Sequence, residues 1–216
     1  MADDFGRFVE RLAERLRQPL PGLKATLHMA PHIRRDLALL NVEGKACREG
    51  AVLVLIFPLD GVPATVLTVR RDDLSAHAGQ VSFPGGRREP NETFLEAALR
   101  EAHEEVGLPI TEDLRVLGRL TPIYVPPSNF CVYPFVAALP RRPHLTPHEA
   151  EVKAILEVPL AHFLDPRVRH EEQRIIEGRP VWVPFYAVGE HKVWGGTAMM
   201  LTELALLIRS INTKEK

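Results

Sequence analysis

Runs of apolar residues, interrupted by turn signals, predict a protein built mainly on strands. The continuous apolar run at residues 51–57 is rich in Val and Ile and predicts a buried strand. A turn signal follows at Asp60-Gly61, and residues 64–70 are then expected to form the partner strand. Further strands are predicted at residues 80–83, 114–120 and 132–139, with a strand or turn at 149–156 and an edge strand at 181–185.

Helical spacing is confined to a few segments. Near the N-terminus, Asp3 or Asp4 can cap a helix whose apolar residues recur at helical intervals, namely Phe5, Phe8, Val9, Leu12 and Leu16. Residues 33–40 are weakly helical. Residues 197–208 predict a closing helix whose inward face carries Met200, Leu201, Leu204, Ala205 and Ile208. Mixed strands with few helices indicate an α/β (α+β) sandwich, which we divide into an N-terminal helical arm, 1–48, and one globular domain, 49–212.

The segment between Gly86 and Leu108 predicts one more helix, with defined ends. Thr93 and Glu96 form the Thr-x-x-Glu pattern of a capping box, and Gly107 stands where a helix ends in a left-handed glycine. The apolar stripe of this helix is expected to consist of Leu95, Leu99, Ala102 and Val106.

Three glutamates of this helix share a different face. Glu101, Glu104 and Glu105 are related as i, i+3 and i+4, so their side chains are neighbours. Like charges at these offsets repel by a few tenths of a kcal/mol per pair. A bound cation would offset this repulsion, and Mg²⁺ and Mn²⁺ are the ions that prefer oxygen ligands. The sequence therefore predicts a carboxylate metal site on a helix that is entered through a glycine loop.

The spacing of these residues resembles the signature of the Nudix hydrolases, G-x5-E-x7-R-E-U-x-E-E-x-G-U with U aliphatic. The matching positions are Gly86, Glu92, Arg100, Glu101, Ala102, Glu104, Glu105, Gly107 and Leu108. The resemblance implies the Nudix fold, a mixed β-sheet sandwiched between α-helices, and metal-dependent cleavage of a diphosphate.

A second pattern just upstream is similar to the coenzyme A pyrophosphatase branch of that family, whose pattern is roughly L-L-T-x-R-S-x3-R-x3-G-x3-F-P-G-G. The matching residues are Leu67, Thr68, Arg70, Gly79, Phe83, Pro84, Gly85 and Gly86. Arg71 stands where Ser is usual, and Ser75 stands where Arg is usual. The branch implies hydrolysis of CoA and its derivatives to 3′,5′-ADP and 4′-phosphopantetheine.

The resemblance also implies roles for individual residues. The expected metal ligands for Mg²⁺ or Mn²⁺ are the carboxylates of Glu101, Glu104 and Glu105, with the carbonyl of Gly86. The expected catalytic residues are Glu104, Glu105, Arg100 and Glu151. In this scheme Arg100 orients Glu92 or Glu104, and Glu151, with Glu149 as the alternative, acts as an extra ligand or general base. The expected substrate-binding residues are Arg70, Arg71, Gly85 and Gly86, with Arg70 open to a structural ion pair instead.

Other functions remain open on the sequence. NADH, ADP-ribose and nucleoside triphosphates are alternative substrates of the same chemistry. A non-catalytic nucleotide-sensing module is an alternative from a different class, although it would have no need for all three glutamates. A calcium-binding domain is not favoured, because no loop offers the alternating oxygen ligands of such sites.

Composition restricts the partners. The net charge of −1 and pI of about 6.8 argue against a nucleic-acid partner, and the longest apolar run is too short to cross a membrane. Cys47 and Cys131 are far apart and form no metal-binding or disulfide pattern. We therefore expect a cytoplasmic protein with reduced thiols and a small-molecule nucleotide substrate. The N-terminal arm could pack on the domain or form a homodimer contact.

Overall fold

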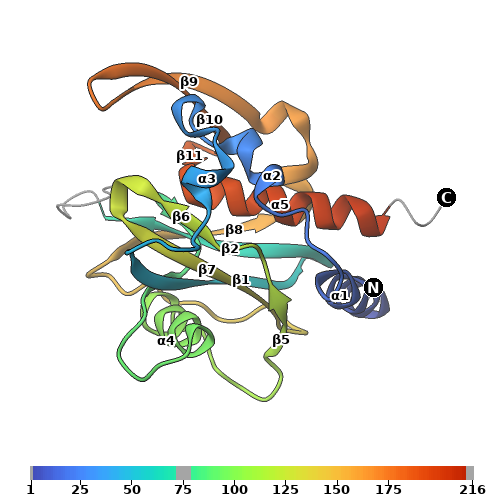
Figure 1. Cartoon of the computed structure of the whole chain (residues 1–216). Helices are drawn as coiled ribbons and strands as arrows, with labels where there is room; N and C mark the ends of the chain where they lie inside the picture. Colours follow the sequence, from blue (N-terminus) through green and yellow to red (C-terminus); the bar gives the residue numbers. More distant parts are fainter. Residues whose placement is uncertain (1, 72–78, 213–216) are drawn as a thin grey trace.

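A mixed β-sheet lies between α4 (Phe94–Val106) on one face and α5 (Gly195–Asn212) on the other, as Figure 1 shows for the computed structural model of the chain. The structure describes residues 2–71 and 79–212. The fold class predicted from the sequence is confirmed. The large sheet consists of β1 (Arg48–Leu59), β2 (Val62–Arg70), β3 (Val81–Ser82), β4 (Gly85–Arg87), β5 (Arg115–Arg119), β6 (Ile123–Val125), β7 (Phe130–Ala138) and β8 (Val152–Pro159).

The order of the large sheet places the β3–β4 segment, which carries the predicted glycine loop, between β1 and β2. Its main path is β3-β2-β1-β7-β5, and β1 and β7 are parallel while the other pairs are antiparallel. β1 pairs with β2 only at one end, over residues 56–59, and at its other end it pairs with β4. The β3–β4 segment therefore fills the gap between the diverging strands β1 and β2.

Each face of the large sheet has its own core. On the α4 side, alternate β1 residues such as Leu53, Leu55 and Phe57 pack with the small residues of α4. On the α5 side, Val54 and Ile56 pack with residues of α1 (Ala2–Leu16) and α5. The period-two alternation of buried side chains explains why the run at 51–57 is apolar throughout. The five residues expected to face inward from the closing helix are all buried.

A second sheet of three strands was only partly predicted. It has the order β11-β10-β9, with β9 (Arg169–Ile176), β10 (Arg179–Val188) and β11 (His191–Trp194). The prediction of an edge strand at 181–185 is wrong, because β10 is the central strand and hydrogen-bonds to both neighbours. A two-residue turn at Glu177-Gly178, with positive φ at both residues, connects β9 to β10.

The N-terminal arm packs on the domain. The predicted first helix is confirmed as α1, and it contacts α5 and β5. It begins at Ala2, so the expectation that Asp3 or Asp4 caps it is wrong. The fully buried carboxylate of Glu203 in α5 accepts a hydrogen bond from the Gly22 amide of the arm at 2.8 Å. It also accepts hydrogen bonds from the Thr121 amide and hydroxyl, at 2.8 and 2.6 Å. One carboxylate thus joins the arm to the β5–β6 connection.

Short helical turns complete the arm and the loops. The weakly helical segment at 33–40 divides into a 3-10 turn, η2 (His32–Arg34), and a single turn of helix, α3 (Leu37–Leu40). The remaining turns are α2 (Leu23–Thr26), η1 (Leu27–Met29), η3 (Pro126–Ser128), η4 (Leu160–Leu164) and η5 (Pro166–Val168).

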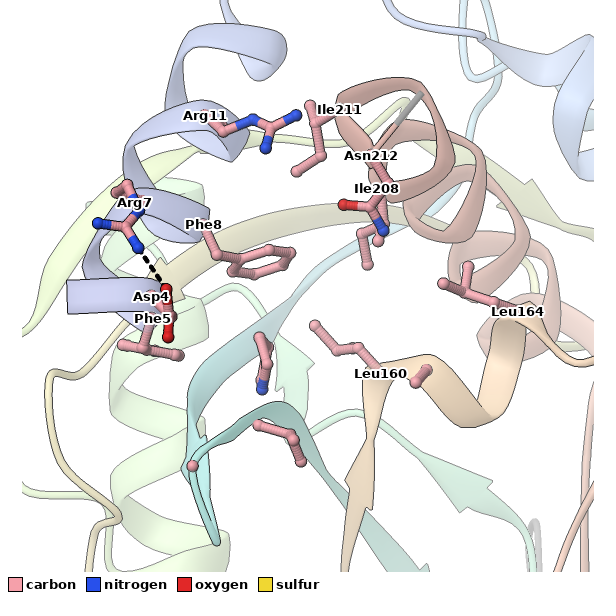
Figure 2. Close-up of a pocket in the computed structure, with 14 residues that line it drawn as sticks. Asp4, Phe5, Arg7, Phe8, Arg11, Leu160, Leu164, Ile208, Ile211 and Asn212 are labelled. Carbon is pink, nitrogen blue, oxygen red and sulfur yellow. Dashed lines mark hydrogen bonds and ion pairs between the residues drawn. The ribbon is translucent and has the colours of Figure 1, made fainter. Parts of the chain in front are cut away.

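A cleft of about 410 Å³ separates α1 from the end of α5 (Figure 2). Phe8, Leu160 and Ile208 form its apolar wall, and Arg7 and Arg11 lie at its α1 side. None of the described residues that line it belongs to the predicted site. None of the helices in the described part of the chain combines the length and the apolar character that a membrane span requires.

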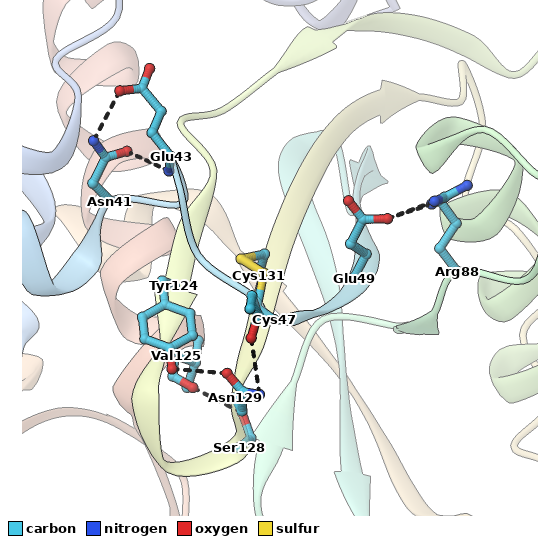
Figure 3. The surroundings of a disulfide bond; sticks show 11 residues. Asn41, Glu43, Cys47, Glu49, Arg88, Tyr124, Val125, Ser128, Asn129 and Cys131 are labelled. Atoms are coloured by element: carbon cyan, nitrogen blue, oxygen red, sulfur yellow. Dashed lines mark hydrogen bonds and ion pairs between the residues drawn. A yellow bond between two sulfur atoms is a disulfide. The ribbon is translucent and has the colours of Figure 1, made fainter.

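The two cysteines form a disulfide bond, so the expectation of reduced thiols is corrected (Figure 3). Cys47 directly precedes β1, and Cys131 lies on β7 opposite Glu49 in the parallel β1–β7 ladder. Their Cα atoms are 5.8 Å apart despite a sequence separation of 84 residues. Spacing in the sequence cannot reveal this pair, because strand pairing between distant segments creates the proximity.

Candidate functional site

The helix that carries the predicted carboxylates begins and ends where the sequence indicates. The Thr93 hydroxyl accepts from the Glu96 amide at 3.2 Å, and the Glu96 carboxylate accepts from the Thr93 amide at 2.7 Å. At the other end, Gly107 adopts φ 64°, a left-handed conformation that glycine permits without cost. The buried face of α4 consists of Ala97, Ala98, Ala102, Glu105 and Val106. It is rotated from the predicted stripe, since Leu95 and Leu99 are only half-buried.

Three glycines bring the backbone of β1 and β4 against the helix. A Cβ on Gly86 would lie 2.5 Å from the Glu101 carboxylate, and a Cβ on Gly85 would lie 2.3 Å from the Ala51 carbonyl oxygen. On the opposite strand, a Cβ on Gly50 would meet the Gly86 carbonyl oxygen at 2.6 Å. A side chain at Gly50 or Gly85 would meet backbone atoms, whereas one at Gly86 would meet the flexible end of Glu101, so Gly86 allows β4 to lie directly against the carboxylate of α4.

The carboxylate of Glu105 is buried at the floor of this arrangement. Its residue is 8% exposed, and its Oε2 accepts a hydrogen bond from the Gly85 amide at 3.1 Å. Burial raises the pKa of Glu105 to about 8, and the charges of Glu101 and Glu151 act in the same direction. The Gly85 amide and Arg70 oppose this shift. Burial also raises the pKa of Glu101, against the hydrogen bond from Arg100.

Arg100 links the remaining glutamates. Its Nε and one terminal nitrogen donate to the two oxygens of Glu92 at 2.8 and 3.1 Å, a bidentate pair. The other terminal nitrogen donates to Glu101 at 2.9 Å and to Glu104 at 3.0 Å. The hydrogen bond from Arg100 also holds the pKa of Glu92 below its usual value. Arg100 was expected to orient either Glu92 or Glu104. In the structure it hydrogen-bonds both, and it also hydrogen-bonds Glu101.

The predicted cluster of three metal-binding carboxylates is not assembled in the structure. Among residues 2–71 and 79–212, no group of three His, Cys, Asp or Glu residues is placed so that it could hold a metal ion. Glu101 and Glu105 face the glycine loop, but the Glu104 side chain is 55% exposed and is held by Arg100. One turn of helix separates Arg100 from Glu104, so the guanidinium lies within hydrogen-bonding distance of the Glu104 carboxylate.

The predicted substrate arginines lie beside Glu151, at the turn that precedes β8. An Arg70 terminal nitrogen is 3.9 Å from a Glu151 carboxylate oxygen, a loose ion pair between side chains that are 37% and 49% exposed. The Arg71 guanidinium donates to the Glu149 carbonyl at 2.7 Å, and the Arg71 amide donates to the Glu151 carbonyl at 3.0 Å. The charge of Glu151 acts on the pKa of both Glu101 and Glu105. Position 75, where the branch pattern differs, lies outside the described residues.

The chemistry of the oxygen donors, rather than their placement in the structure, fits a divalent cation. A carboxylate such as Glu105, buried with one backbone hydrogen bond, is costly to ionise unless a positive charge approaches it. Glu101 and Glu105 offer hard oxygen ligands, and Glu151 offers a third carboxylate nearby. The roles of Glu101, Glu104, Glu105 and the Gly86 carbonyl as ligands stay predictions.

Three residues of this site were not singled out from the sequence. Gly50 precedes an apolar run and carries no chemical signal, although its close approach to Gly86 requires glycine. Glu49 at the start of β1 and Arg88, the residue after β4, form an ion pair in which Arg88 donates to Glu49 at 3.1 and 2.6 Å. Only the pairing of β1 with β4 brings them together, so spacing along the chain could not reveal them.

We expect Gly86→Ala to impair activity rather than folding. The new methyl group would displace the end of the flexible Glu101 side chain, and a shift of about 1 Å at a reacting centre costs about 10²-fold in rate. Steady-state kinetics and a melting curve would separate the two effects. Gly6→Ala is a matched control, because a Cβ there meets nothing within 4 Å. Unchanged activity in Gly86→Ala would contradict the close packing of Gly86 on a functional Glu101.

Comparison with known proteins identifies related sequences and folds. Residues 48–178 match the family profile of the NUDIX domain. The chain is 37% identical over 167 residues to a protein named uncharacterized Nudix hydrolase NudL from Photorhabdus laumondii, covering 73% of this chain and 83% of that protein. It is 38% identical over 170 residues to the mitochondrial coenzyme A diphosphatase NUDT8 of Homo sapiens, covering 76% and 71% of the two chains. The solved structure of the Nudix hydrolase RenU from M. smegmatis shares the fold, with a TM-score of 0.50, 21% identity, and coverage of 78% of this chain and 88% of that chain.

Proposed function

Because the chain belongs to the Nudix hydrolases, a family that acts on pyrophosphate bonds, we propose that it hydrolyses the diphosphate of coenzyme A and CoA derivatives. The products would be 3′,5′-ADP and the corresponding 4′-phosphopantetheine. The observation that carries the hydrolytic part is the buried Glu105 carboxylate beside Glu101 and the glycine loop. The CoA pyrophosphatase pattern before that loop and the name of the human relative support the choice of substrate.

The proposed site solves an electrostatic problem of diphosphate cleavage. Phosphate oxygens repel an anionic nucleophile, so charge must be neutralised where the bond breaks. A divalent cation held by Glu101 and Glu105 would supply this neutralisation and a water of lowered pKa. Arg100 fixes the orientation of Glu101 through its hydrogen bond, and its bidentate pair with Glu92 fixes the guanidinium itself.

Two further residues have proposed roles at the edge of the site. Glu151 is the carboxylate that could accept a proton or add a ligand, because it lies near Glu101 and Glu105 and is half-exposed. Arg70, which pairs loosely with Glu151, has an exposed guanidinium that could contact a substrate phosphate. Exposure of both side chains allows the 3.9 Å pair to rearrange when an anion binds.

A panel of substrates tests the proposed function. We would measure kcat/KM with Mg²⁺ for CoA, acetyl-CoA, NADH, ADP-ribose and dNTPs, with Mn²⁺ as a second metal. The proposal predicts the highest values for CoA and its thioester. Preference for NADH or ADP-ribose would overturn the CoA assignment and keep the diphosphatase, whereas no turnover with any compound would leave a nucleotide-binding module.

We expect CoA to be cleaved more efficiently than dephospho-CoA. A fixed cation that meets the 3′-phosphate contributes about 1.5–3 kcal/mol through a charge-assisted hydrogen bond, equivalent to about a 10- to 150-fold difference. Arg70→Ala should reduce this ratio. Arg71→Ala is the companion variant, and because its guanidinium holds the Glu149 carbonyl, it should also disturb the loop. Equal kcat/KM values for CoA and dephospho-CoA would remove the 3′-phosphate from recognition.

A further inference from the structure

We propose that Glu49 and Arg88 are positioning residues that lock the carboxylates of α4 in place for the metal ion. This inference rests on the metal centre of the proposed function. Neither residue is a specified position of the family signature that the chain matches. The pair joins the start of β1 to the loop that leads into α4, and Figure 3 shows the Glu49 and Arg88 side chains pointing toward each other.

The Glu49–Arg88 pair is held by both side chains and backbone. Two guanidinium nitrogens of Arg88 donate to the same Glu49 oxygen at 3.1 and 2.6 Å, and the Arg88 amide donates to the Glu49 carbonyl at 3.0 Å. The Arg88 guanidinium also lies 5.0 Å from the centre of the Phe94 ring, which stacks on Tyr133. Arg88 therefore has a fixed orientation although its side chain is 31% exposed.

The remaining guanidinium nitrogen of Arg88 fixes the position of Glu92. It donates to the Glu92 carbonyl at 2.8 Å, so the backbone of Glu92 is tied to β1. The Glu92 carboxylate in turn forms the bidentate pair with Arg100. Arg100 holds Glu101 at 2.9 Å. A continuous series of hydrogen bonds thus connects Glu49 to Glu101, a predicted metal ligand.

The start of β1 is a firm anchor for this series. Glu49 lies opposite Cys131 in the β1–β7 ladder, and the disulfide holds Cys47 two residues earlier. Gly50, next in the chain, packs directly on the Gly86 carbonyl. The start of β1 and the glycine loop therefore pack against each other, and Arg88 connects them through Glu92 and Arg100 to the Glu101 carboxylate.

The energetic role of the pair differs from that of a stabilising ion pair. The side chains of Glu49 and Arg88 are 40% and 31% exposed, and such exposed pairs contribute about 0–1 kcal/mol to stability. Residues that hydrogen-bond directly to metal ligands, by contrast, change metal affinity about 10- to 100-fold when they are replaced. Arg88 acts on Glu101 through Glu92 and Arg100, so we expect the lower end of that range. Loss of this pair should consequently weaken metal binding much more than folding.

Binding of Mn²⁺ to the free full-length protein, measured by electron paramagnetic resonance, tests the proposal without relying on turnover. The variants are Glu49→Gln, Arg88→Ala and the double variant. Arg142→Ala is the matched control, because Arg142 also donates two guanidinium nitrogens to one carboxylate, that of Glu157, away from this site. We expect about tenfold weaker Mn²⁺ binding in each single variant, a similar value in the double variant, and parental binding in Arg142→Ala.

The melting temperature of each variant separates positioning from folding. Positioning predicts melting temperatures close to that of Arg142→Ala together with the loss of Mn²⁺ affinity. Mn²⁺ binding within twofold of the parent in Glu49→Gln would overturn the proposal even if Arg88→Ala failed to fold. Absence of Mn²⁺ binding in the parent itself would instead remove the metal centre of the proposed function, and the positioning role with it.

Discussion

Glu105→Gln should lower kcat/KM by about 10³-fold while the protein remains folded. The amide keeps the size of the side chain and can still accept the hydrogen bond from the Gly85 amide. It loses the negative charge that would hold a divalent cation, and several kcal/mol of transition-state stabilisation depend on that cation. A loss of about 4 kcal/mol corresponds to about 10³-fold in rate. Steady-state kinetics at saturating Mg²⁺ measures the effect.

The same substitution should stabilise the metal-free protein. Glu105 is 8% exposed, and its burial opposes ionisation, so a neutral amide at this position removes a cost of folding. The parent should gain about 2.7 kcal/mol at a metal concentration of 100 times its dissociation constant, and the variant should gain much less. Melting curves measure both effects: with EDTA the variant should melt at the higher temperature, and Mg²⁺ should raise the melting temperature of the parent more than that of the variant.

Glu96→Gln is the matched control for Glu105→Gln. It lies on the same helix, and glutamine also serves in a capping box, so both activity and metal response should stay close to those of the parent. Near-parental activity of Glu105→Gln, or metal stabilisation equal to that of the parent, would contradict the assignment of Glu105 to a metal site.

Removal of the disulfide should produce the largest loss of stability. The bond closes a loop with a sequence separation of 84 residues, and a cross-link of that span restricts the unfolded chain strongly. We expect the Cys47→Ala/Cys131→Ala variant to lose about 2–5 kcal/mol of unfolding free energy. Urea denaturation of the parent and the variant measures it.

The parent treated with a reducing agent is the internal comparison for that variant. Its urea denaturation midpoint should shift toward that of the double variant. Titration of the denatured parent should find two thiols only after reduction. Two free thiols before reduction would contradict the bond. So would identical denaturation midpoints for the untreated parent and the double variant.

Local signals made α4 and its ends predictable. A capping box, a C-terminal glycine and the offsets of the glutamates depend on residues within a few positions of one another, and the structure confirms the helix they predicted. The continuous apolar run at 51–57 likewise predicted β1, because a strand covered on both faces needs apolar residues at every position. The fold class followed from these elements.

Contacts between distant segments were not predictable in the same way. The Cys47–Cys131 bond and the Glu49–Arg88 pair both depend on which strands lie next to β1. The ligand role of Glu104 stays a prediction. Arg100 lies one turn before Glu104 and hydrogen-bonds its carboxylate, a contact that the i, i+4 spacing of the two residues made predictable.

Product analysis with CoA tests the central claim most directly. The parent and Glu105→Gln would be incubated with CoA, with Mg²⁺ or with EDTA, and the products separated by chromatography. The account predicts 3′,5′-ADP and 4′-phosphopantetheine in equal amounts from the parent with Mg²⁺, and almost none from Glu105→Gln or with EDTA. Intact CoA after incubation with the parent and Mg²⁺, or equal cleavage by Glu105→Gln, would contradict it.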